Sequence, residues 1–188
     1  VDGIVLDWLR FDDYNMDMGD DTRKRFKEAF GYDPISINQS SDNPLRAQWN
    51  AWRTAQIARY VESVRHAVNE IKPGLDLGVY ILPPEFVEVG QDAGQFSQHV
   101  NLLSPMVYFD DWGYPISWVH TNVLPQTWEK AKGVAVIPVM DTDWSDAAYG
   151  ELFTHIRKDF PGISTLSWFV YGVWTEETFQ RINMLRSR

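Results

Sequence analysis

The chain alternates between continuous apolar runs and amphipathic segments. The first run extends from Gly3 to Leu9, and four similar runs follow it: "LDLGVYIL", "VNLLSPMVYF", "GVAVIPVM" and "ISTLSWFVYG". Runs in which apolar residues are continuous rather than alternating are typical of strands that are buried on both faces. The pattern therefore predicts five strands in a parallel sheet that is covered by helices.

The segments between the runs have helical features. Asp20 to Phe30 predicts a short helix that ends at Gly31. Asn43-Pro44 predicts the N-cap and first position of a long helix that reaches about Lys72. This long helix carries one apolar stripe with spacings of three and four, formed by Ile57, Val61, Val64, Val68 and Ile71.

Later helices complete five strand–helix units. They are predicted near Ala93–His99 and in "TNVLPQTWEKAK", "DAAYGELFTHIRKDF" and "TEETFQRINMLRS", the last with Thr175 as its N-cap. Right-handed crossovers between parallel strands give either a doubly wound sheet or a (β/α) barrel. The barrel is favoured because no glycine-rich phosphate loop follows the first run. In addition, nearly every run ends in the polar or aromatic residues that barrel enzymes gather there.

The length indicates how much of a barrel is present. A complete eight-stranded barrel takes about 250 residues, whereas this chain has 188. We therefore predict an α/β fold that is the C-terminal portion of a TIM (β/α)8 barrel, with parallel strands in sequential order. Residues 1–188 form one domain in this prediction, and about three N-terminal strand–helix units are missing before Val1. Gly3–Leu9 and Ile163–Phe169 should then be unpaired edges at opposite ends of the sheet.

Composition narrows the possible partners. The formal net charge is −9 and the isoelectric point is near 4.8, which argues against nucleic acid, because phosphate binding needs clustered Lys and Arg. No run approaches the roughly 18 apolar residues of a membrane span. The chain has no Cys, but it has nine Trp, eight Tyr and ten Phe. Flat aromatic faces suit sugar rings, although most Trp side chains are simply buried in cores.

Several motifs resemble glycoside-hydrolase barrels. "DGIVLDWLRF" resembles their fourth strand, "SPMVYF" followed by two Asp their sixth, and "SWFVYG" their eighth. The chain is most similar to the bacterial glycosyl-hydrolase-like families of lipoproteins and exopolysaccharide-processing enzymes. Their "W-x-x-W-R" element resembles Trp49 to Arg53, and their "GQD" element resembles Gly90 to Asp92. The resemblance implies a secreted, periplasmic or cell-surface bacterial protein that acts on a polysaccharide or oligosaccharide and needs no cofactor.

One position departs from the related chitinase pattern. Chitinase-type barrels carry "DGxDxDxE" on their fourth strand, and the last Glu is the general acid. The matching positions here are Asp2, Val5, Asp7 and Leu9. Because Leu9 cannot donate a proton, the resemblance argues against substrate-assisted chitinase chemistry, and any general acid must come from another strand.

Asp7 is the first candidate catalytic carboxylate. A structural interpretation is that it caps the loop after its strand or pairs with Arg10. A functional interpretation is that it is the nucleophile or electrostatic stabiliser of glycoside hydrolysis. An ionised carboxylate beside Trp8 loses hydration, so a nearby cation such as Arg10 would help to keep it charged.

The second carboxyl group that hydrolysis needs has more than one candidate. We take Asp110 as the expected general acid and Glu85, which follows two prolines, as its rival. Asp111 and Asp143 are expected to contact substrate, although Asp110 and Asp111 could equally form a solvated turn. Asp143 has a structural alternative as an acid at a helix N-terminus.

Aromatic side chains at the strand ends are the candidate sugar platforms. With Arg10, Asp111 and Asp143 they make up the predicted substrate-binding set, whose aromatic members are Trp8, Tyr108, Trp112, Trp168 and Tyr171. Trp49 and Trp52 lie off the apolar stripe of the long helix, and we expect them to pack against the Asp33–Asp42 loop. No metal site is expected, because the four His lack ligand spacing. The alternative function is a carbohydrate-binding barrel that has lost hydrolysis.

Overall fold

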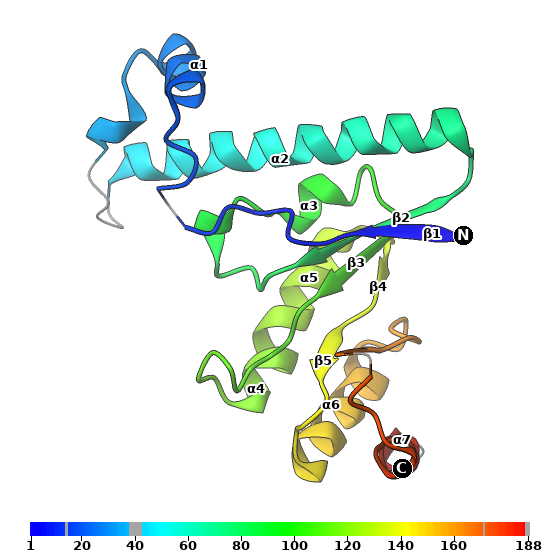
Figure 1. Cartoon of the computed structure of the whole chain (residues 1–188). Coiled ribbons are helices and arrows are strands. Elements are labelled where there is room, and N and C mark those ends of the chain that lie inside the picture. The colour runs from blue at the N-terminus through cyan, green and yellow to red at the C-terminus, as the bar shows by residue number, and fades with distance from the viewer. Residues whose placement is uncertain (14, 38–42, 171, 187–188) are drawn as a thin grey trace.

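Parallel strands in chain order form the centre of the molecule. The computed structural model describes residues 1–13, 15–37, 43–170 and 172–186 (Figure 1). Its strands are β1 (Gly3–Leu6), β2 (Asp76–Ile81), β3 (Leu102–Pro105), β4 (Ala135–Val136), β5 (Val139–Asp141) and β6 (Ser167–Phe169). β1 to β4 form one sheet in sequential order, β5 pairs with β6, and every pair is parallel. The predicted fold class, a portion of a (β/α) barrel, is confirmed.

The helices alternate with the strands. The α-helices are α1 (Asp20–Phe30), α2 (Pro44–Ile71), α3 (Ala93–Phe96), α4 (Ile116–Trp118), α5 (Leu124–Ala131), α6 (Asp146–Asp159) and α7 (Glu176–Arg186). Further helical segments are the 3₁₀ helices η1 (Pro34–Ser36) and η2 (Val87–Val89) and the π-helix η3 (Val119–Val123). Figure 1 shows α2 near β1 and β2 at one end of the row of strands, and α6 and α7 near β5 at the other end.

The predicted helix boundaries depend on local capping signals. Gly31 follows α1 in the left-handed conformation, with φ of 85°, which residues with a Cβ adopt at a cost. The Asn43 side chain accepts a hydrogen bond from the Leu45 amide at 3.0 Å. Thr175 does the same for the Thr178 amide at 3.1 Å. These three boundaries confirm the sequence predictions.

The fourth apolar run is divided into two strands. β4 pairs with β3, whereas β5 pairs with β6. Pro138 lies between them and has no amide hydrogen with which to continue the ladder. A parallel bridge between Met106 and Val139 links β5 to the segment that follows β3. The two short sheets therefore continue one sequential row of strands.

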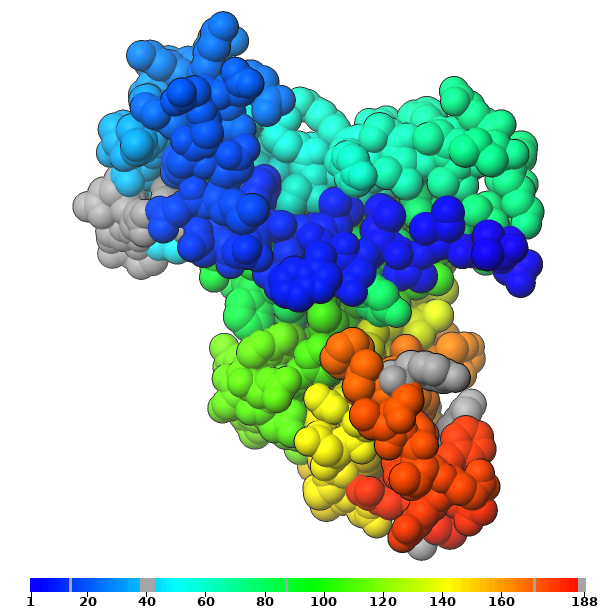
Figure 2. Space-filling view, viewed as in Figure 1, coloured from blue at the N-terminus to red at the C-terminus, as the bar shows by residue number. Residues whose placement is uncertain are grey.

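The two edge strands are shorter than predicted. β6 begins at Ser167 rather than Ile163. β1 ends at Leu6 rather than Leu9, because Trp8 adopts a positive φ of 55°. Its side chains are also not buried on both faces, since Ile4 and Val5 are each 40% exposed. Figure 2 shows the dark blue segment with β1 and the orange segment with β6 on the same face of the molecule.

Strand order agrees with a partial barrel. In the described part of the chain, β1 pairs only with β2, and β6 pairs only with β5. The first and last strands are therefore edges that do not pair with each other, as predicted. The exposure of β1 has the same cause, because an edge strand has a neighbour on one side only.

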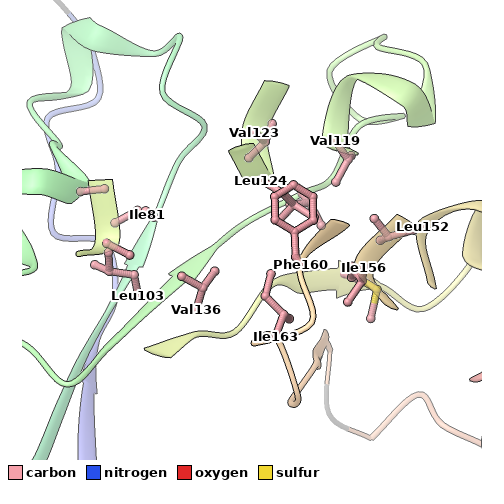
Figure 3. Packing of buried hydrophobic residues seen from close by; sticks show 14 of the residues in the cluster. Ile81, Leu103, Val119, Val123, Leu124, Val136, Leu152, Ile156, Phe160 and Ile163 are labelled. Atoms are coloured by element: carbon pink, nitrogen blue, oxygen red, sulfur yellow. The ribbon is translucent and has the colours of Figure 1, made fainter. Parts of the chain in front are cut away.

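The main core lies between the sheet and its helices. Leu77, Val79 and Leu103 from the central strands are fully buried. Figure 3 shows Phe160, at the end of α6, among Val123, Leu124, Ile156 and Ile163. On α2, the predicted stripe is buried at Ile57, Val61 and Val68. Its last member, Ile71, is 86% exposed, because the helix ends there at the loop to β2.

A separate aromatic cluster joins α1 to the start of α2. Trp49 is fully buried, and its ring lies 5.0 Å from Phe26 and 5.5 Å from Trp52, measured between ring centroids. Ile37 is the third buried member of this group. Trp49 and Trp52 were predicted to pack against the Asp33–Asp42 loop. Their cluster with Ile37 confirms this prediction for the first part of the loop, whereas residues 38–42 lie outside the described residues.

Candidate functional site

A cleft of about 710 Å³ opens at the carboxyl ends of the strands. Parallel strands bring these ends to one edge of the sheet, which is where barrel enzymes place their active sites. The loop after β1 and strand β6 both contribute to its wall, although they are far apart in sequence. Six of the predicted site residues line it: Asp7, Trp8, Arg10, Tyr108, Trp112 and Trp168.

The loop after β1 presents its first two residues to the cleft. The Asp7 carboxylate accepts a hydrogen bond from the Trp8 amide at 2.7 Å, which is the capping contact that the structural interpretation expected. Trp8 is 71% exposed and has left-handed backbone geometry. This backbone conformation is energetically unfavourable for residues other than glycine, and such backbone strain is concentrated at binding sites. The indole face is consequently open to a ligand.

Arg10 interacts with Trp8 rather than with Asp7. Its guanidinium carbon lies 4.4 Å from the centroid of the Trp8 ring, within the range of a cation–π contact. Its Nη1 is 3.5 Å from a carboxylate oxygen of Asp12. Among the described residues Arg10 forms no ion pair with Asp7, so the expected pairing was wrong. Arg10 instead holds the exposed indole in place.

Tyr108 lines the cleft and interacts electrostatically with carboxylates of two different loops. Burial is the main cause that raises the pKa of its hydroxyl, and the negative charges of Asp141 and Asp7 raise it further. The Tyr108 hydroxyl therefore remains protonated and can donate a hydrogen bond to a ligand or to a carboxylate.

Asp141, at the end of β5, has a perturbed carboxyl group. Burial is the main cause that raises its pKa, and the negative charges of Asp143, Asp111 and Asp110 raise it further. A hydrogen bond from the Thr142 amide, at 2.6 Å, partly offsets this increase. Sequence analysis assigned Asp141 no role. The available signal was its position at the end of an apolar run, which it shared with several other Asp residues.

The predicted general acids lie outside the cleft lining. Glu85 accepts a hydrogen bond from Trp118 Nε1 at 2.6 Å. Asp110 accepts one from Nε1 of the buried Trp144 at 3.1 Å. Asp111 and Asp143 are exposed beyond the lining as well, where their charges act on Asp141. Tyr171 lies outside the described residues.

Aromatic rings form an arc along the cleft. Trp112 lies 5.3 Å from Phe86 and 5.8 Å from Tyr108, and Tyr108 lies 6.2 Å from Phe169. Sequence analysis missed Phe86 and Phe169, together with the lining residues Tyr80, Met106 and Glu88. Phe169 belongs to the same run as Trp168, and an apolar run alone does not show which of its side chains face a cavity.

Among the described residues, no three His, Asp or Glu side chains are grouped so that they could hold a metal ion. Within the same residues, no helix is both long enough and apolar enough to cross a membrane.

Comparisons with known proteins bear on the fold. No protein-family model matches the chain, and no curated protein sequence is similar to it. Its structure is similar to a chitinase from Chromobacterium violaceum, with a TM-score of 0.58 and 9% sequence identity. The similarity covers 73% of this chain and 63% of the chitinase chain. The chain has a glycosyl-hydrolase-like fold. The resemblance seen in the sequence is therefore confirmed at the level of the fold.

Proposed function

We propose that the protein is a glycoside hydrolase that cleaves a polysaccharide in the cleft at the strand ends. The observation that carries this proposal is the position of Asp7 beside an arc of aromatic rings in a cleft of about 710 Å³. Aromatic faces bind the apolar faces of sugars, and a strand-end carboxylate supplies the chemistry of glycosidic bond cleavage. The glycosyl-hydrolase-like fold supports the same conclusion.

Asp7 is the proposed nucleophile or electrostatic stabiliser. Its carboxylate is exposed at the cleft and accepts a hydrogen bond from the Trp8 amide, which orients it. Arg10 and Trp8 would bind the sugar from the same loop. Tyr108, Trp112 and Trp168 would do so from the opposite wall, and Asp111, Asp143 and Tyr171 remain proposed outer contacts.

A carboxyl group with a raised pKa is needed to protonate the leaving group. The pKa of Asp141 is raised. Its negative charge in turn raises the pKa of Tyr108, which lines the cleft. Asp110 and Glu85 remain candidates, but each already accepts a hydrogen bond from a Trp side chain. We take Asp141 as the general acid because its pKa is raised, and it lies outside the cleft lining as Asp110 and Glu85 do.

Hydrolysis assays on chitin, cellulose, xylan and poly-N-acetylglucosamine test the assignment of Asp7. In the Asp7→Asn variant, kcat/KM should fall by about 10³-fold or more, as expected for loss of a group that acts in the transition state. Asp2→Asn is the matched control, since Asp2 precedes the other end of β1, and it should retain full activity. Undiminished activity of Asp7→Asn would end the assignment.

Substrates with activated leaving groups identify the general acid. A dinitrophenyl glycoside departs without protonation, so a variant that lacks the acid should keep most of its rate on this substrate while losing it on a polysaccharide. We expect this pattern for Asp141→Asn and not for Asp110→Asn or Glu85→Gln. The same pattern in either of the latter two would reassign the role.

Leu9 supports a second candidate function. This residue takes the place of the chitinase general acid in the motif, and its side chain packs against the main core. The alternative is therefore a carbohydrate-binding barrel that does not hydrolyse its ligand. Saturable binding of an oligosaccharide that stays intact, with single replacements of the strand-end acids leaving affinity unchanged, would favour this alternative.

The proposed setting is a larger barrel outside the bacterial cytoplasm, as secreted, periplasmic or cell-surface polysaccharide enzymes are. β1 and β6 each have one unpaired side in the described residues, and further strands would cover the exposed Ile4 and Val5 side chains. The activity assays above should therefore use the full-length protein.

A further inference from the structure

The loop formed by residues 7–13, which carries Asp7 and Trp8, is tied to the rest of the molecule through one glutamine. Gln91 Nε2 donates hydrogen bonds to the carbonyl oxygens of Leu9 and Tyr80, each at 3.1 Å. Gln91 Oε1 accepts a third from the Leu82 amide at 2.8 Å. One side chain thus joins the middle of this loop to the end of β2, and both amide hydrogens and the carbonyl are used.

A second contact follows directly in the sequence. The Phe11 amide donates to the Val89 carbonyl at 2.9 Å, and the Phe11 ring lies against Gly90. A Cβ on Gly90 would lie 2.7 Å from this ring, and Gly90 has a φ of 76°. The position therefore excludes larger residues both by space and by backbone conformation.

A third contact comes from α2. The guanidinium carbon of the buried Arg53 lies 4.1 Å from the centroid of the Phe11 ring, and its Nη2 donates to the Asp13 carbonyl. The "W-x-x-W-R" and "GQD" elements, which are about 40 residues apart, therefore converge on the same loop. Gln91 is the member nearest to Asp7, because Leu9 is only two residues away.

We propose that Gln91 is a positioning residue that fixes the 7–13 loop, so that Asp7 and Trp8 are held in productive orientation at the cleft. The kinetic part of this inference rests on the proposed hydrolase function, whereas the structural part does not. A misplacement of about 1 Å can lower a catalytic rate by about 100-fold. Gln91 does not line the cleft itself, so its effect is transmitted through the loop backbone.

Amide hydrogen exchange of the full-length protein, followed by NMR, tests the structural part. Gln91→Met keeps the length of the side chain but removes all three hydrogen bonds. Exchange at the Phe11 amide should become about 10-fold faster or more, with little change in the β2 and β3 amides. Gln95→Met is the matched control, since Gln95 lies nearby in α3 and its side chain has no hydrogen bond to this loop among the described residues.

Kinetics test the functional part on the polysaccharide that the wild type hydrolyses best. Gln91→Met should lower kcat by about 10- to 100-fold and change KM less than about 3-fold, whereas Gln95→Met should leave both unchanged. If Gln91→Met does not fold, Gln91→Glu replaces it, because a carboxylate keeps the acceptor for Leu82 and loses both donors. It should accelerate Phe11 exchange and lower kcat in the same way.

The outcomes separate the two proposals. Unchanged exchange in the Gln91 variants, or equal acceleration in Gln95→Met, would overturn the positioning role. A loosened loop with unchanged kcat would overturn it as well. Faster exchange in a protein whose wild type hydrolyses none of the four polysaccharides would support the loop contact and reject the hydrolase function.

Discussion

Two aromatic groups in this molecule have similar composition and opposite exposure. Around α1 and α2, Trp49 is fully buried between Phe26 and Trp52. At the cleft, Trp8 is 71% exposed, and its ring is contacted by the Arg10 guanidinium. The rings of the first group pack against one another. The cleft side chain instead leaves one face open, and this face can accept a ligand.

The difference shows that aromatic content alone does not indicate sugar binding. Helix α2 places Trp49 and Trp52 one turn apart, so their rings stack and are covered by α1. Trp8 follows a strand and has left-handed backbone geometry. Its ring is therefore directed away from the packed core.

Trp49→Ala should lower the free energy of unfolding by about 3–5 kcal/mol, as expected for truncation of a fully buried Trp. Chemical denaturation measures this change. Trp8→Ala is the comparison and should change stability by less than about 0.5 kcal/mol, because its side chain is mostly solvated. Equal losses in the two variants would contradict the assignment of separate roles.

Trp8→Ala should instead weaken ligand binding by about 10-fold, or about 1.4 kcal/mol. Calorimetry with a hexasaccharide of the hydrolysed polymer measures the affinity, in an Asp7→Asn background that prevents turnover. Trp128 on α5 is also partly exposed but does not line the cleft. Trp128→Ala should bind normally, and a similar loss in both variants would argue against stacking at Trp8.

Asp141 should make stability depend on pH in an unusual direction. Its pKa is raised mainly by burial, so the folded protein binds its proton to a higher pH than the unfolded chain does. This contribution favours folding at low pH and is lost as pH rises through the raised pKa. Asp141→Asn should therefore increase Tm at pH 7 by a few degrees and have less effect near pH 4. A lower Tm at pH 7 would contradict this sign.

Asp33, next to the buried aromatic group, should change the pH dependence of stability in the direction opposite to that of Asp141. This is the smallest of the expected effects. Its hydrogen bonds with Arg23, at 2.6 and 3.0 Å, are the main cause that lowers the pKa of its carboxyl to about 2. The contribution to stability is present above the unfolded pKa of about 3.9 and is lost as pH falls toward 2. Acid unfolding of Arg23→Gln and Asp33→Asn should lack this component, and an unaltered profile in both would exclude it.

The sequence by itself determined the local elements and their order. Apolar periodicity identified the strands and α2, and Gly31, Asn43 and Thr175 marked helix ends, because caps act within one turn of the chain. Continuous apolar runs indicated parallel strands, and the polar and aromatic residues at their ends favoured the sequential order of a barrel. It also identified Asp7, Trp8 and Tyr108 as strand-end residues, and these line the cleft.

Tertiary structure decided which of these side chains act together. The exposure of Ile4 and Val5 depends on the position of β1 at the edge of the sheet, which no local pattern encodes. The raised pKa of Asp141 depends on burial and on three charges, of which those of Asp110 and Asp111 come from another loop. Gln91 reaches the β1 loop across 82 positions of sequence. Burial, electrostatic interactions and hydrogen bonds depend on the neighbours of a residue in space. For these residues, important neighbours come from distant parts of the chain.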